Sequence, residues 1–129
     1  ALPIFPERPV AEAKVELSFD ATLADQGKAL ATEYGCRGCH SIDGSAGTGP
    51  TWKGAYGEKV RLSTGKQVVR DEVYIHESIV NPDAKIVANY SSGSMAAGLG
   101  TKLTNELTVD ANVKALVEYY KSVRAGEAK

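Results

Sequence analysis

The chain has few of the side chains that fill a core or bind a metal. Its 129 residues include only two cysteines, two histidines, two phenylalanines, one tryptophan and one methionine. A structural zinc site needs four ligands, and the second histidine, His76, is far in sequence from the two cysteines. Because phenylalanine and tryptophan are so few, the core needs apolar surface from another source.

Long apolar runs and a strong charge of one sign are also missing. The formal net charge is −1, so no strong field would draw the chain to nucleic acid or to anionic lipid. No apolar run approaches the ~20 residues of a transmembrane helix. The composition, 43% hydrophobic and 24% charged, is ordinary for a soluble globular protein, and the length predicts one domain.

The two cysteines lie close together, in the stretch Cys36-Arg37-Gly38-Cys39-His40. C-x-x-C-H is the attachment signature of a c-type haem, in which two thiols add to the vinyl groups and the histidine binds the iron. A redox dithiol normally carries no histidine at this place, and a short-range disulfide would leave His40 unexplained. The sequence therefore predicts one haem c, held through Cys36 and Cys39, whose apolar surface completes a small core.

The first 20 residues differ in pattern from the rest. Residues 1–9 hold three of the five prolines, and residues 13–19 alternate between apolar and polar side chains. An extended N-terminal arm over residues 1–20 is the prediction, with a disordered leader as the alternative. Haem is attached to such motifs outside the cytoplasmic membrane. We therefore expect a periplasmic or otherwise extracytoplasmic protein whose signal, or membrane anchor, lies upstream of Ala1.

Three stretches have the apolar spacing of amphipathic helices: residues 22–34, residues 71–80, and a last helix from residue 108 or 110 to 124. Residues 58–70 predict two short strands around a turn at residues 63–65. The remaining stretches, rich in glycine and small polar residues, predict long loops. The expected fold is mainly α, with a small β-hairpin inserted.

The loop after His40 contains three candidates for contact with the haem. The carbonyl group of Pro50 could accept a hydrogen bond from the His40 ring and so fix its tautomer. Trp52 and Tyr56 each combine an apolar body with a donor group, which suits a buried haem propionate. Plain core packing is the alternative for both aromatic residues.

Met95 is the candidate for the sixth iron ligand. It is the only methionine, and it stands in a Ser/Gly-rich stretch rather than on a periodic apolar face. A thioether is soft and favours ferrous iron, whereas the alternative reading of a lone methionine is a core filler. His76 is read as a partly exposed helix histidine and not as a ligand.

The chain resembles the class I cytochromes c. The matching pieces are Gly27 and Leu30 before the motif, CRGCH, Gly49-Pro50, Asn81-Pro82, a downstream methionine, and a last helix with Leu116 and Tyr119. More closely, GPTWKGAYG, DEVYIHESIVNPDAKIVANY and LVEYYKSV resemble the cytochrome c domain fused to subunit II of some haem–copper oxygen reductases. The resemblance covers about residues 24–124.

The resemblance implies a cytochrome c domain over residues 21–129, with three main helices around one covalent haem. It implies a monomeric, mono-haem electron carrier of a respiratory chain, not an enzyme, with His40 and Met95 as iron ligands. It also implies that Pro50 offers its carbonyl to His40 and that Gly27 packs against Tyr119. The acceptor would be a terminal oxidase, and the donor a quinol-oxidising complex or another small redox protein.

Two departures from the family pattern bear on these expectations. Ala96 follows Met95, where relatives usually have proline, and the N-terminal arm resembles neither the copper-binding domain of subunit II nor its linker. A free-standing or anchored carrier is therefore preferred over an excised oxidase domain. The alternative from a different class is a haem sensor or haem enzyme with an open sixth position.

Overall fold

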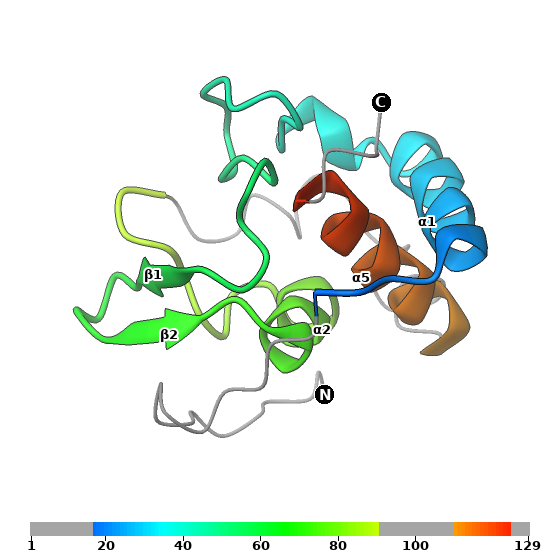
Figure 1. Cartoon of the computed structure of the whole chain (residues 1–129). Helices are drawn as coiled ribbons and strands as arrows, with labels where there is room; N and C mark the ends of the chain where they lie inside the picture. The colour runs from blue at the N-terminus through cyan, green and yellow to red at the C-terminus, as the bar shows by residue number, and fades with distance from the viewer. Residues whose placement is uncertain (1–16, 91–109, 125–129) are drawn as a thin grey trace.

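The computed structural model describes residues 17–90 and 110–124. Within these ranges the chain forms α1 (Ala21–Glu33), the 3-10 helix η2 (Cys36–Gly38), β1 (Lys59–Arg61), β2 (Gln67–Val69), α2 (Glu72–Val80) and α5 (Asp110–Arg124) (Figure 1). The predicted mainly helical fold with a small hairpin is confirmed. None of the helices in these ranges is long and apolar enough to cross a membrane. Residues 1–16 of the predicted arm, and Met95, lie outside the described residues.

Local signals set both ends of α1. The carboxylate of Asp20 accepts a hydrogen bond from the backbone N–H of Leu23 at 3.0 Å, which caps the first turn. Tyr34 is the C-cap, and Gly35 follows in the left-handed region at φ 70°, which a glycine adopts without strain. These two residues place the helix within one residue of the predicted range.

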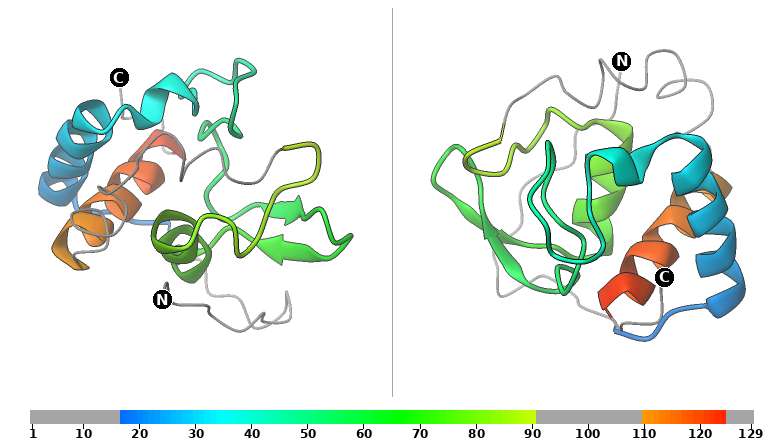
Figure 2. Two further views of the ribbon diagram at one scale, coloured as in Figure 1. Left: turned by 180° about the vertical axis from the view of Figure 1, so that it is seen from behind. Right: turned by 90° about the horizontal axis from the view of Figure 1, so that it is seen from above.

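Helices α1 and α5 lie side by side in all three ribbon views (Figures 1 and 2). The contact is closest at Gly27, where an added Cβ atom would stand 2.0 Å from the carbonyl oxygen of Ala115 and 2.7 Å from the Cβ of Tyr119. The expected packing of Gly27 against Tyr119 is therefore present. A glycine here lets the two backbones approach each other directly.

Helix α5 is buried on more than its predicted apolar stripe. Lys121 is 4% exposed, and its Nζ atom lies 3.0 Å from Glu118 and 2.8 Å from Glu72 of α2. Glu118 also accepts a hydrogen bond from the backbone N–H of Asp20 at 2.8 Å. These charged groups, which the sequence pattern did not predict to be buried, join the start of α1 and the start of α2 to α5.

Helix α2 ends at the predicted residue, Val80, and begins one residue later than predicted, with Asp71 as its N-cap. The buried Asp71 carboxylate accepts a hydrogen bond from the backbone N–H of Tyr74 at 2.9 Å, and the helix stops at Asn81, before Pro82. Tyr74 and Ile75 face the core. Val73 is 43% exposed, so it does not belong to the buried face of this helix.

The hairpin is joined by its backbone to the segment that follows α2. Strands β1 and β2 are antiparallel, as predicted. On its other side the chain after β1 forms a bridge between Leu62 and Val87, flanked by hydrogen bonds from Ser63 N–H to the Ile86 carbonyl (2.7 Å) and from Ala88 N–H to the Arg61 carbonyl (3.0 Å). Segment 86–88 is therefore held like a short third strand.

Candidate haem-binding site

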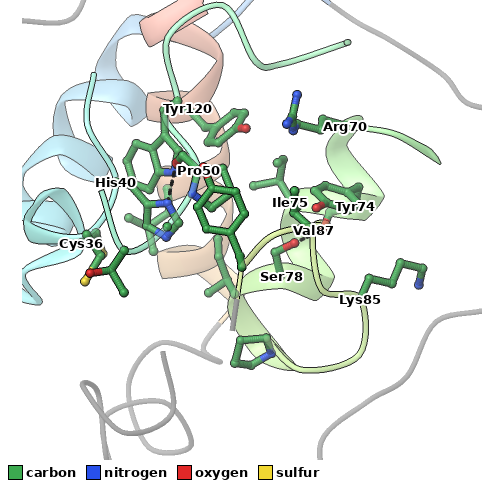
Figure 3. Close-up of a pocket in the computed structure, with 18 of the residues that line it drawn as sticks. Cys36, His40, Pro50, Arg70, Tyr74, Ile75, Ser78, Lys85, Val87 and Tyr120 are labelled. Carbon is green, nitrogen blue, oxygen red and sulfur yellow. Dashed lines mark hydrogen bonds between the residues drawn. The ribbon is translucent and has the colours of Figure 1, made fainter. Parts of the chain in front are cut away.

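A cavity of about 240 Å³ lies between the loop that follows His40, helix α2 and segment 86–90. Figure 3 shows Cys36, His40 and Pro50 on one side of it and residues of α2 on the other. Most of its wall is apolar, with side chains that include Pro50, Ile75, Ile79, Ile86, Val87 and Leu116. Such a wall suits a large, flat and mainly apolar ligand.

The short helix η2 brings both cysteines to the cavity. Backbone N–H groups of Cys39 and His40 donate to the carbonyl of Cys36, at 3.3 and 3.0 Å, and fold the motif into one tight turn. Both cysteines are among the residues that line the cavity, and they are not joined in a disulfide. Burial raises the pKa of the Cys36 thiol, a backbone hydrogen bond opposes this in part, and the proximity of Cys39 adds to the rise. The attacking thiol of a redox dithiol has a lowered pKa instead.

The imidazole of His40 is oriented by its neighbours. Its Nδ1 atom lies 2.7 Å from the carbonyl oxygen of Pro50, which can only accept, so Nδ1 carries the proton. Burial lowers the pKa of His40, and the bond to Pro50 opposes this in part. The neutral ring then keeps its lone pair on Nε2, which is the form that binds a metal. Glycine is required at position 49, because an added Cβ would stand 2.4 Å from the ring's Cε1 atom.

Polar side chains gather on the α2 side of the cavity, and Figure 3 labels four of them: Arg70, Tyr74, Ser78 and Lys85. Lys85 pairs with Glu77, which is 2% exposed. Burial raises the pKa of the Tyr74 hydroxyl, and the charge of Arg70 opposes that rise. The sequence analysis did not identify Arg70 as a cavity residue. The available signal was its position, a positive charge between the buried end of β2 and the N-cap of α2.

Of the other predicted site residues that the structure describes, one lines the cavity and one does not. Trp52 lines the cavity, and its ring is stacked on that of His40 with centroids 5.3 Å apart. Tyr56 does not line it. That residue is 1% exposed and packs edge-on against Tyr120 at 6.2 Å, so the structure favours core packing for Tyr56. His76 is half-buried on α2 and is not among the residues that line the cavity.

The residues present fit a haem c. Two thiols and a neutral imidazole meet on one side of an apolar cavity, and a guanidinium lies where a carboxylate-bearing edge could be neutralised. Over residues 17–90 and 110–124, no three side chains of His, Cys, Asp or Glu gather where they could hold a metal ion. The described part of the chain therefore offers no zinc site.

Comparisons with known proteins agree with this assignment. No family model matches the chain. Cytochrome c2 iso-1 of Magnetospirillum fulvum is 34% identical over 99 residues, which cover 69% of this chain and 91% of the relative. The protein of the same name from Magnetospirillum molischianum is 32% identical over 99 residues, covering 69% and 90%. The chain belongs to the class I cytochromes c.

Two solved structures of an engineered cytochrome c from Rhodothermus marinus are also similar. One matches with a TM-score of 0.48 and 23% identity, and one bound to a carbene intermediate with 0.46 and 22%; each match covers 92% of this chain and 91% of the other. Membership of the family establishes the general activity. The protein is an electron carrier and not an enzyme, and its cofactor is one haem c attached covalently through Cys36 and Cys39.

Proposed function

We propose that this cytochrome passes single electrons to a haem–copper oxygen reductase. Its donor would be a quinol-oxidising complex or another small redox protein. The resemblance of residues 49–57, 71–90 and 116–123 to the domain fused to oxidase subunit II supports the choice of acceptor. The protein would work as a monomer outside the cytoplasmic membrane, where haem is attached, with any anchor upstream of Ala1.

The observation that carries the proposal is the contact between His40 and Pro50 inside a cavity that both cysteines line. Held in this way, His40 would bind the iron of the haem through Nε2, and we assign Met95 as the other protein ligand. When it is bound, the haem supplies a centre that can be reduced and reoxidised by one electron. Apolar walls exclude water, which lowers the reorganisation that accompanies electron transfer and favours the less charged ferrous state.

The α2 side of the cavity would hold the carboxylates of the haem. Arg70 lines the cavity and is a permanent cation, and its guanidinium matches a carboxylate in a bidentate fashion. Lys85 is less suited to this role, because Glu77 already neutralises it. Arg70 therefore takes the place that the sequence pattern gave to Tyr56, while Trp52 remains at the cavity.

Absorption spectroscopy tests the ligand assignment. The ferric protein should show a sulfur-to-iron band near the red end of the visible spectrum, and Met95→Ala should abolish it. The native ferrous form should not bind carbon monoxide, whereas the Met95→Ala form should. Carbon monoxide binding by the native protein would point instead to a haem sensor or enzyme with an open sixth position.

We also propose that the partner docks through weakly charged contacts. The loops at residues 35–50 and 83–100 hold few charges, and one of these, Lys85, is neutralised by the buried Glu77. Contacts of this kind depend little on salt. The rate at which this cytochrome reduces an oxidase should therefore change less than about threefold between low and moderate ionic strength. A many-fold decrease would contradict the proposal.

We favour a free-standing or anchored carrier over a domain cut from a longer oxidase subunit. Support comes from residues 1–20, which resemble neither a copper-binding domain nor its linker. The nucleotide sequence upstream of the codon for Ala1 decides between them. A signal sequence or a single anchoring segment there would support the proposal, and a copper-binding domain would contradict it.

A further inference from the structure

The imidazole of His40 is restrained by three neighbouring residues, Gly49, Pro50 and Trp52, which we call the imidazole clamp. The Pro50 carbonyl accepts the Nδ1 hydrogen bond at 2.7 Å, and the backbone of Gly49 lies against the ring. The indole of Trp52 is stacked on the ring, with an angle of 22° between the two planes. The hydrogen bond to Pro50 explains why the ring is in the tautomer that binds iron, but it does not explain why Trp52 is stacked on the ring.

We propose that Trp52 is a positioning residue that fixes the plane of the His40 imidazole. The inference rests on the proposed role of His40 as an iron ligand. A single hydrogen bond at Nδ1 holds one atom of the ring and leaves the tilt of the ring plane only weakly restrained. A flat aromatic surface stacked on the ring removes that freedom, because a tilted imidazole would lose the contact.

Trp52 is itself held firmly enough to act in this way. Its backbone N–H donates to the carbonyl of Ser41 at 2.8 Å. Its ring packs edge-on against Tyr119 at 5.9 Å and, tilted, against Tyr120 at 5.4 Å. Both tyrosines belong to α5. This helix therefore holds the indole of Trp52 in place, and through it the orientation of the imidazole.

The plane of an axial imidazole has a measurable consequence. In a low-spin ferric haem it determines which of two nearly equal iron orbitals holds the unpaired electron, and so how the spin is spread over the ring. The hyperfine shifts of the four haem methyl groups in the proton NMR spectrum report that spread. The exchange rate of the His40 Nδ1 proton with solvent reports how often the bond to Pro50 opens.

The experiment compares three variants of the haem-loaded protein. Trp52→Phe keeps a flat ring and should retain the wild-type pattern of methyl shifts. Trp52→Leu removes the ring and should narrow the spread of those shifts, with Nδ1 exchange about five- to tenfold faster, as expected from losing one aromatic pair. Ile79→Ala is the matched control, because it removes another apolar side chain that lines the same cavity, from α2.

Unchanged methyl shifts and unchanged exchange in Trp52→Leu would overturn the proposal, as would an equal effect of Ile79→Ala. If Trp52→Leu gives no holoprotein, Tyr119→Leu replaces it. Tyr119 contacts the indole but does not line the cavity, so its loss should still speed Nδ1 exchange beyond the Ile79→Ala value, and no difference would refute the clamp. A wild-type ferric spectrum without hyperfine-shifted His40 resonances would instead refute the ligand assignment in the proposed function.

Discussion

Replacing Gly27 by alanine tests the helix contact on which the fold depends. The new Cβ atom would stand 2.0 Å from the Ala115 carbonyl oxygen, whereas unstrained contacts need about 3.5 Å. Helices α1 and α5 would have to separate locally by about 1.5 Å. Overpacking of this kind costs about 3 kcal/mol, and the better helix propensity of alanine returns about 1 kcal/mol. The net loss of about 2 kcal/mol should lower the Tm by about 8 °C.

Urea unfolding followed by far-ultraviolet circular dichroism measures this loss. Ala29→Gly serves as the matched control, because Ala29 is exposed on the same helix and its replacement reports helix propensity alone. That variant should lose about 1 kcal/mol. If Gly27→Ala were instead more stable than the native protein by a similar amount, the contact with α5 would not be as close as described.

Two further predictions concern buried polar groups. Lys121→Ala should lower the free energy of unfolding by about 3 kcal/mol, because it leaves the buried carboxylate of Glu118 without its cation, whereas Glu58→Ala breaks an exposed pair and should cost less than about 1 kcal/mol. Equal losses in the two urea titrations would show that burial does not matter here. Burial raises the pKa of Tyr120 in the folded chain, so above about pH 10 the unfolded chain releases a proton that the folded chain keeps. Stability should therefore fall with rising pH by up to about 1.4 kcal/mol per unit above pH 10, less steeply in Tyr120→Phe, and parallel slopes from urea titrations would contradict the pKa shift.

The parts of the fold that local chemistry determines were predictable. The stop at Gly35 and the ends of α2 depend on residues next to them in sequence, and the hairpin depends on the turn between its strands. The buried position of Lys121 was not predictable, because it results from carboxylates on two other segments that meet only in the folded chain.

In the candidate site, too, features set by the local sequence were predictable and features set by distant contacts were not. The C-x-x-C-H motif was recognisable because covalent attachment fixes its spacing, and His40 follows from it. The position of Arg70 depends on how β2 and α2 are joined, which no periodic pattern encodes. Trp52 lines the cavity, and its stacking on His40 depends on the tyrosines of α5. Tyr56 has the same chemistry as a propionate donor and is turned into the core instead.

The bridge between Leu62 and Val87 gives the hairpin an importance that its small size hides. Ile86 and Val87 both line the cavity, so a slip of one residue at this bridge would move both side chains along the cavity wall. Lengthening the hairpin turn by a single residue would threaten that alignment. Variation in this surface turn could thus retune the electronic environment of the iron without altering any residue that touches it.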